Sequence, residues 1–272
     1  IHILGKKMVT KKAFKRVAIF SSQSNKAKDQ VAGQCLEVFN NLGIRTVLSD
    51  NFKKVTFDGP GKLVSDSTIL KTCDLVIAIG GDGTMLSCSR KFGSKGIPIL
   101  GINLGKLGFL SDLGLDDLTY NLREIVNGKF LVDSRFFIEA SLNNSKKVQI
   151  AVNEVVLHSG ALAQMLEYEL YIDNKFVYQQ KADGVIVSSP TGTTAYSLSG
   201  GGPIVHPDVQ SMIILPMFPH SLSTSPLVVK SSSEIQIHIL QCKNNAKLSF
   251  DSHDSLILGK GDIINIKESQ KN

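Results

Sequence analysis

The chain has 272 residues, of which 42% are hydrophobic and 20% are charged, and its formal net charge is +6. This length allows one large domain or two ordinary ones, and the composition is that of a globular protein. The lysines and arginine between Lys6 and Arg16 could contact nucleic acid, but no aromatic interleaving or base-reading motif accompanies them. We interpret them as a solvated basic arm and expect no nucleic-acid partner.

The four cysteines, Cys35, Cys73, Cys88 and Cys242, show no Cys-x-x-Cys spacing, and three of them fall within apolar or helical patterns. Buried reduced thiols and a cytoplasmic location are therefore expected. No apolar run approaches the length of a membrane span and no signal peptide is evident, so no membrane partner is expected. Seven residues precede Met8, which we interpret as a natural start, and they are left out of the fold prediction.

The first half of the chain alternates strand-like and helix-like segments. The apolar run at 74–79 is typical of a buried strand, while 26–42 has apolar residues on one helical face and Gly43 placed to end the helix. Strands separated by helices predict an α/β domain with a Rossmann-like parallel sheet. The other predicted strands of this half are 16–20, 45–48 and 97–102, and the other predicted helices are 84–92 and 118–127.

From about residue 130 the pattern changes to short β-rich runs separated by turn residues. Such a pattern is typical of an all-β domain, predicted here to be a sandwich. We therefore expect an α/β domain at 8–129, a β-rich domain at 130–266 and a polar tail at 267–272. The predicted strands of the β-rich domain are 136–142, 148–157, 167–172, 184–187, 213–217, 227–229, 235–240 and 247–250.

The segment Ile79-Gly-Gly-Asp-Gly-Thr84 joins a predicted strand to a predicted helix. Its glycines let backbone N–H groups come close to a ligand, and the positive end of the helix adds to a cradle for phosphate. Asp82 lies in the middle of this cradle. A carboxylate beside phosphates is unfavourable unless it takes a proton or meets a metal ion, so the motif predicts phosphoryl transfer to a hydroxyl with Asp82 as general base. Asp-Gly is also common in hairpin turns, but the strand-then-helix pattern disfavours a hairpin.

Two further segments are candidates for ligand binding. Asn153 and Glu154 interrupt an apolar run, and their side chains suit ribose hydroxyls, although a simple strand end would explain them equally well. Asp183 precedes a predicted strand, after which 188–203 is dense in hydroxyls and glycines and includes the aromatic ring of Tyr196. This composition fits a loop that wraps a polar ligand. A flexible linker is the alternative, and a helix-compatible run within the segment disfavours it.

Taken in order, these segments resemble the NAD kinases, which phosphorylate the adenosine-ribose 2′-hydroxyl of NAD to make NADP. The Gly-Gly-Asp-Gly-Thr motif is shared with diacylglycerol and sphingosine kinases, whereas the Asn-Glu pair and the Thr-Ala-Tyr loop are more specific to NAD kinases. The similarity runs from about residue 16 to 266 and rests on 80–84, 101–110, 153–154, 183–184, 190–196 and 200–203, with 215–222 and 226–229 similar to the bacterial branch.

The resemblance implies a phosphotransferase that uses ATP with a divalent cation, usually Mg²⁺, binds NAD through the 130–266 domain and forms homodimers or homotetramers. It does not identify which residues would bind the metal ion. Asp82 would be the catalytic base. The implied nucleotide-binding residues are Gly81, Gly83 and Thr84 at phosphates, Phe109 near the adenine, Asn153 and Glu154 at ribose hydroxyls, and Asp183, Thr191, Thr194, Ala195, Tyr196 and Ser199 along the pocket, with Asp183 near the nicotinamide.

Two features depart from the family pattern. Thr193 stands where many members carry Ser, and the chain ends soon after Ile266 whereas bacterial relatives usually continue. Two alternatives to an NAD kinase stay open. A lipid kinase could share the phosphate loop, but it would leave Asn153 and Glu154 without a role. A non-catalytic NAD(P)(H) sensor could share the whole fold, but the presence of Asp82 favours an enzyme, because a sensor needs no base.

Overall fold

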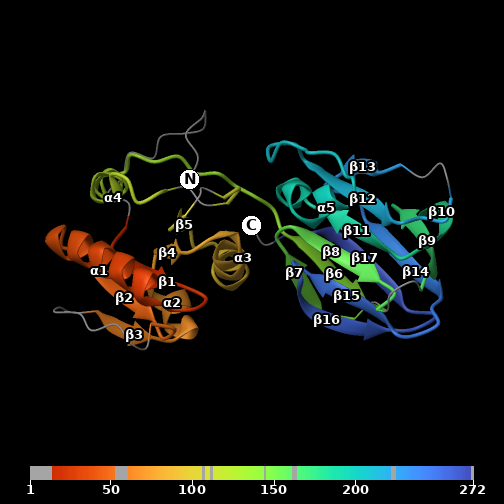
Figure 1. Cartoon of the computed structure of the whole chain (residues 1–272), viewed down its shortest axis with the longest axis horizontal. Coiled ribbons are helices and arrows are strands. Elements are labelled where there is room, and N and C mark those ends of the chain that lie inside the picture. The colour runs from red at the N-terminus through yellow and green to blue at the C-terminus, as the bar shows by residue number, and fades with distance from the viewer. Residues whose placement is uncertain are drawn as a thin grey trace. The chain divides into compact units, whose positions relative to one another are not determined.

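The structure is a computed structural model, and it describes residues 14–52, 61–105, 108–110, 113–143, 145–160, 164–221 and 225–270. The chain divides into two compact units, Ile1–Ser134 and Arg135–Asn272. Figure 1 shows that helices belong mainly to the first unit and that strands dominate the second. Within the described ranges, no helix is long and apolar enough to cross a membrane.

The first unit is a five-stranded parallel sheet with the strand order β3-β2-β1-β4-β5 and helices on both faces. This confirms the predicted α/β class. A short strand and a helix, β3 and α2, lie outside the predicted set. The elements are β1 Arg16–Phe20, α1 Lys26–Asn41, β2 Arg45–Ser49, β3 Lys62–Val64, α2 Asp66–Thr72, β4 Leu75–Ile79, α3 Asp82–Lys91, η1 Gly93–Lys95, β5 Ile99–Ile102 and α4 Leu118–Val126.

Two hydrophobic cores lie on the two faces of this sheet, because successive residues of a strand point to opposite sides. In β4, Ile77 and Ile79 belong to the core that α1 and α4 cover, while Val76 and Ala78 belong to the core that α2 and α3 cover. All five residues of β4 are buried, which explains its continuous apolar sequence. Strand β4 therefore gives a rigid base to the loop that follows it.

The end of α1 follows the prediction made from Gly43. This residue has φ +69, a conformation that glycine adopts without steric cost. Its N–H donates to the Asn40 carbonyl at 3.0 Å, and the N–H of Ile44 donates to the Phe39 carbonyl at 2.9 Å. These two bonds form a Schellman motif, which satisfies carbonyls at the helix end and turns the chain into β2.

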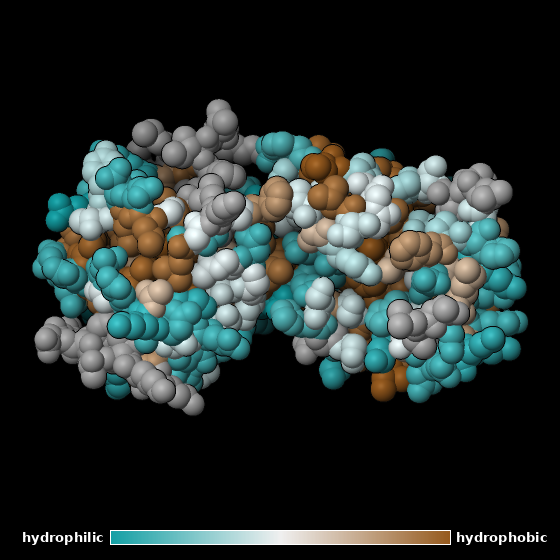
Figure 2. All heavy atoms as spheres, in the orientation of Figure 1, coloured by the Kyte–Doolittle hydropathy of each residue, from teal (hydrophilic) through white to brown (hydrophobic). Residues whose placement is uncertain are grey.

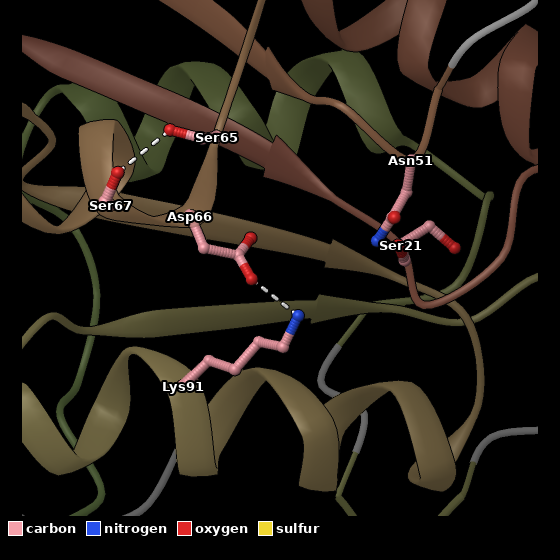
Figure 3. A network of polar contacts seen from close by, with 6 residues as sticks. All are labelled: Ser21, Asn51, Ser65, Asp66, Ser67 and Lys91. Atoms are coloured by element: carbon pink, nitrogen blue, oxygen red, sulfur yellow. Dashed lines mark hydrogen bonds and ion pairs between the residues drawn. The ribbon is translucent and has the colours of Figure 1, made fainter.

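Polar contacts connect the helices that cover one face of the sheet (Figure 3). Lys91, in the last turn of α3, donates its Nζ to Asp66 Oδ2 in the first turn of α2 at 2.6 Å. Lys91 also lies over the Phe20 ring, 5.3 Å from its centroid. At the end of β1, the Asn51 amide donates to the Ser21 carbonyl at 2.8 Å. Exposed ion pairs contribute roughly 1 kcal/mol or less, so these contacts mainly orient the helices.

The second unit consists of two six-stranded antiparallel sheets, ordered β10-β9-β14-β17-β6-β7 and β13-β12-β11-β8-β15-β16. Residues of both sheets share one hydrophobic core, which confirms the predicted sandwich. The elements are β6 Ile138–Leu142, β7 Val148–Ala151, β8 Glu154–His158, β9 Leu166–Ile172, β10 Lys175–Ala182, β11 Gly184–Ser188, η2 Thr191–Thr194, α5 Tyr196–Ser199, β12 Ser211–Met217, β13 Leu227–Lys230, β14 Ile235–Gln241, β15 Ala246–Phe250, β16 His253–Leu258 and β17 Ile263–Glu268.

The strands of this unit differ from the prediction in two ways. The predicted strand 148–157 is two strands, β7 and β8, that belong to different sheets, and the chain crosses between the sheets at Val152 and Asn153. Strands β10, β16 and β17 lie outside the predicted set. Of these, β10 and β16 are edge strands, and edge strands commonly carry polar residues that hide the apolar pattern.

Candidate functional site

The glycine loop follows β4 at the carboxyl end of the parallel sheet, where ligands bind in such folds. Gly80 has φ +149, and its N–H donates to the Ile102 carbonyl at 2.9 Å. A Cβ on Gly80 would lie 2.4 Å from Thr84 Oγ1, so the loop leaves space for glycine alone. Thr84 is buried, and its hydroxyl lies 3.0 Å from the hydroxyl of Ser22, which follows β1. The loop is thus fixed against the end of the neighbouring strand.

Helix α3 begins at Asp82, two residues before the predicted start at 84, with Gly81 as its N-cap. The early start puts Asp82, Gly83 and Thr84 in the first turn, whose N–H groups lie at the positive end of the helix. Gly81 and Gly83 are exposed, and no atom lies within 4 Å of the position of a Cβ on either. The first turn of α3 therefore presents accessible backbone N–H groups suited to a phosphate.

The Asp82 carboxylate also contacts the segment that follows β5. Its Oδ2 accepts the N–H of Phe109 at 3.3 Å, and its Oδ1 accepts the N–H of Leu110 at 3.2 Å. A Cβ on Gly108 would lie 2.3 Å from Oδ1, so glycine permits this approach. The Phe109 side chain is 66% exposed and free to pack against a flat ring. The structure thus brings the predicted base and the predicted adenine contact together.

In the second unit, the crossing between β7 and β8 presents two buried polar atoms. Asn153 is 8% exposed and Glu154 is 2% exposed. Among the described residues, Asn153 Oδ1 and Glu154 Oε2 have no hydrogen-bond partner. A buried polar atom without a partner costs about 1–3 kcal/mol, so this pair indicates a place where a ligand supplies the missing bonds.

The environment of Glu154 changes its acidity. Burial, and to a smaller extent the negative charge of Asp251, raise the pKa of the Glu154 carboxyl to about 7 against the opposing effect of a hydrogen bond from the Tyr196 backbone N–H. Near neutral pH the carboxyl therefore exists in both forms and can accept or donate a hydrogen bond.

The segment rich in hydroxyls and glycines packs directly on this crossing. The N–H of Ser189 donates to the Asn153 carbonyl at 2.8 Å, and a Cβ on Gly192 would lie 2.2 Å from the same oxygen. The segment then forms the short helices Thr191–Thr194 and Tyr196–Ser199. It is therefore an ordered part of the site, and the linker interpretation is wrong.

The hydroxyls of this segment have different surroundings. Thr191 is buried, and its Oγ1 accepts a hydrogen bond from Arg135 Nη1 at 3.3 Å. Thr193 is buried too, donating to the Pro190 carbonyl at 2.6 Å and accepting from the Val205 N–H at 3.1 Å. A serine at this position could make the same bonds, which explains why the departure from the family pattern is tolerated. The other predicted residues here are Thr194 and Ala195, half-buried, and Tyr196 and Ser199, exposed.

Asp183 lies at the opposite end of β11 from these residues. Strand β11 pairs antiparallel with β8, with Ser188 opposite Glu154 and Gly184 opposite His158. At roughly 3.4 Å per residue, the two ends are about 14 Å apart. The structure therefore does not bring Asp183 together with Glu154, and the spacing fits a long ligand that follows the strand.

Asp251, which is 3% exposed, lies outside the residues predicted from the sequence. Its carboxylate accepts three backbone N–H groups of the crossing, from Val152 at 3.0 Å, Asn153 at 2.7 Å and Glu154 at 3.3 Å. Asp251 and Ser252 form the turn between β15 and β16, and both have positive φ, as a type I′ hairpin turn requires. This turn lacks the glycine that usually marks such hairpins, so the sequence pattern contained no clear signal.

Comparisons with known proteins identify the family to which both units belong. Residues 18–130 match the ATP-NAD kinase N-terminal domain and residues 152–272 match the ATP-NAD kinase C-terminal domain. The NAD kinase of Teredinibacter turnerae is 43% identical over 207 residues, which cover 75% of this chain and 71% of the relative. The NAD kinase of Saccharophagus degradans is 39% identical over 230 residues, which cover 83% of this chain and 78% of the relative.

Solved structures show the same similarity over both units. Yeast NADH kinase complexed with NADH superposes with a TM-score of 0.82 at 28% identity, covering 94% of this chain and 79% of the yeast chain. An NAD kinase from Archaeoglobus fulgidus in complex with ATP superposes with a TM-score of 0.74 at 27% identity, covering 94% of this chain and 91% of that chain. Both family models and relatives above 30% identity thus span most of the sequence, and the chain belongs to the ATP-NAD kinase family.

Proposed function

We propose that the protein transfers the γ-phosphate of ATP to the adenosine-ribose 2′-hydroxyl of NAD, giving NADP and ADP, with Asp82 as the general base. Membership of the family makes the chain an NAD kinase, a phosphotransferase with an alcohol group as acceptor. The observation that carries the proposed role of Asp82 is its position in the first turn of α3, where a carboxylate lies among N–H groups suited to phosphate.

In this mechanism the Asp82 carboxylate accepts the proton of the 2′-hydroxyl as its oxygen attacks the γ-phosphorus. The bond between the γ-phosphorus and the bridging oxygen breaks, and ADP leaves with the electron pair. The N–H groups at Gly81 and Gly83 offset the phosphate charge, and Thr84, whose own N–H donates to the Gly81 carbonyl at 2.9 Å, holds the turn that presents them. Much of the rate in phosphoryl transfer comes from positioning and charge stabilisation, and a base adds about 10²–10⁴-fold.

A divalent cation, Mg²⁺, is part of the proposal as a companion of ATP. Within the described ranges, no group of three or more His, Cys, Asp or Glu side chains could bind a metal ion. This fits Mg²⁺, which commonly keeps several waters and binds through substrate phosphates and one or two carboxylates. Asp82 is the carboxylate beside the phosphate loop that could contribute such an oxygen. When bound, the ion offsets negative charge on the phosphates.

The proposed NAD-binding residues lie in the second unit, within the domain predicted at 130–266. Asn153 Oδ1 and Glu154 Oε2, both buried and without partners in the described chain, would bind ribose hydroxyls. The exposed ring of Tyr196 would pack along the dinucleotide, with Thr191, Thr194, Ala195 and Ser199 around it. Asp183, just beyond the end of β11 that lies about 14 Å away, would lie toward the nicotinamide.

Assembly and location complete the proposal. Hydrophobic residues reach the surface of both units (Figure 2), and the second unit exposes Phe218, Ile204 and Ile257. Several exposed apolar side chains support contacts between copies of the chain, so we propose a homodimer or homotetramer. Sedimentation velocity would test this assembly. Three of the four free cysteines are buried, which supports a reducing compartment such as the cytoplasm.

The experiment that tests the activity measures NADP formation from NAD, ATP and Mg²⁺ with an NADP-specific dehydrogenase. Product that depends on ATP is expected. Folded protein that binds NAD without forming NADP would overturn the proposal in favour of a sensor.

The role of Asp82 is tested by Asp82→Asn. We expect a loss of turnover of about 10²-fold or more with NAD binding largely kept, since the amide cannot accept the proton. Asp66→Asn is the matched control, because Asp66 also lies in the first turn of a helix of the same unit. Unchanged turnover in Asp82→Asn would remove this residue from the chemistry.

A further inference from the structure

The backbone N–H and carbonyl groups of Val152, Asn153 and Glu154, at the crossing between β7 and β8, all have partners other than the Asn153 side chain. The N–H groups of Val152, Asn153 and Glu154 donate to the buried Asp251 carboxylate. On the acceptor side, Ser189 Oγ donates to the Val152 carbonyl at 2.6 Å, and the Ser189 N–H donates to the Asn153 carbonyl. The Asp251 N–H donates to the Glu154 carbonyl at 3.0 Å. Two side-chain atoms, Asn153 Oδ1 and Glu154 Oε2, are left over.

This arrangement matters because an asparagine side chain readily bonds to nearby backbone N–H groups and forms an Asx turn. At this crossing Asp251 occupies the N–H groups of residues 152–154. The N–H two residues on, at Val155, belongs to β8, where Val155 pairs with Val187 of β11 and Phe250 of β15. The Asp251 carboxylate, together with the pairing of β8, therefore keeps the Asn153 side chain from bonding to its own backbone. The buried side-chain oxygens of Asn153 and Glu154 therefore stay available to a ligand.

We propose that Asp251 is a positioning residue for NAD: by binding the three N–H groups of residues 152–154, it keeps Asn153 Oδ1 and Glu154 Oε2 free for the ribose hydroxyls. The inference rests on the proposed function, because it assigns Asp251 an effect on the same substrate. Asp251 itself is a buried turn residue and acts through its two neighbours.

The chain contains a second turn of the same kind, which separates positioning from ordinary stabilisation. Asp173 and Asn174 also have positive φ in a two-residue hairpin turn, between β9 and β10. The Asp173 carboxylate accepts the N–H of Glu234 at 2.9 Å and the hydroxyl of Ser233 at 3.3 Å, and the Asp173 N–H donates to the Glu234 carbonyl at 2.8 Å. Asp173 thus connects two loops in the same way, at a place where no predicted site residue lies.

The test compares Asp251→Asn with Asp173→Asn. Both variants replace one carboxylate oxygen by an amide group that cannot accept an N–H, and both should lower the melting temperature. We expect Asp251→Asn to raise the KM for NAD by roughly 10- to 100-fold, since small misplacements of binding groups have effects of this size. The KM for ATP should stay near the wild-type value in both variants, and Asp173→Asn should leave the KM for NAD unchanged. Equal KM values for NAD in Asp251→Asn and wild type would overturn the inference.

A measurement on the unmodified protein covers the case in which Asp251→Asn does not fold. Hydrogen exchange followed by NMR should show slow exchange of the Asn153 and Glu154 amides before NAD is added, comparable with the Glu234 amide bound to Asp173. Fast exchange that slows only on addition of NAD would mean that the ligand orders the crossing, and the inference would be wrong. A wild-type protein that forms no NADP would instead refute the proposed function, so the two failures are distinguishable.

Discussion

Glu154→Gln is expected to stabilise the ligand-free protein at neutral and alkaline pH and to have little electrostatic effect in acid. In the folded chain, burial first and the Asp251 charge second raise the pKa of Glu154 from its ordinary value of 4.5 to about 7. The folded state therefore binds this proton more tightly than the unfolded state does. Between these two pKa values the stability falls as the pH rises, and above about pH 7 the full cost of the buried charge is present.

The size of the effect follows from the same two values. One pKa unit corresponds to about 1.4 kcal/mol, so the rise from 4.5 to about 7 corresponds to about 3 kcal/mol. Glutamine fills nearly the same volume without a charge and avoids this cost. The variant should thus be more stable than the wild type by about 3 kcal/mol at pH 8, and the difference should shrink toward pH 4.5.

Urea unfolding at several pH values between 4.5 and 8.5, without NAD, would check this prediction. The chain has no tryptophan, and four of its five tyrosines lie in the second unit, so tyrosine fluorescence mainly reports the unit that contains Glu154. Glu37→Gln on the exposed face of α1 is the control, because that carboxylate stays hydrated in both states. A difference between Glu154→Gln and wild type that does not vary with pH would refute the reasoning.

Two glycine substitutions test the geometry of the two sites. Gly80→Ala should destabilise the protein by about 1–3 kcal/mol and reduce turnover, because φ is +149 and the new Cβ would lie 2.4 Å from Thr84 Oγ1; chemical denaturation and the NADP assay would measure both. Gly192→Ala should raise the KM for NAD, since its Cβ would lie 2.2 Å from the Asn153 carbonyl oxygen and must displace that backbone. Gly259→Ala is the control for both, because no atom lies within 4 Å of that Cβ position. If either variant had the same stability and kinetics as this control, the geometry described above would be contradicted.

The parallel sheet could be predicted from the sequence because its signals are local. Strand β4 is buried on both faces and is therefore a continuous apolar run, and Gly43 marks the end of α1 through its own conformation. The start of α3 at Asp82 was placed two residues late, because glycines usually argue against a helix interior. In this helix Gly81 is the N-cap and Gly83 lies in the first turn, where glycine is less unfavourable than in the helix interior.

The second unit was harder to predict because its contacts are distant in sequence. Asn153 and Glu154 stood out as polar residues in an apolar run, but the run could not show that the chain changes sheets there. Asp251 lies almost a hundred residues further along, and its role depends on three backbone N–H groups that no sequence pattern displays. Its hairpin uses Asp-Ser where Asn-Gly is the usual signal.

The buried polar pair Asn153 and Glu154 therefore has opposite effects on the stability of the free protein and on ligand binding. Glu154 is buried without a partner for Oε2, next to a second buried carboxylate, and this lowers the stability of the ligand-free fold at neutral pH. A ligand whose hydroxyls donate to these oxygens removes part of that cost, so binding should be favoured by the same feature that weakens the free protein. Asp251 makes this possible, because it satisfies the backbone of the crossing and leaves the side chains of Asn153 and Glu154 for the substrate. Local rules of folding are commonly broken in this way where a protein binds its ligand.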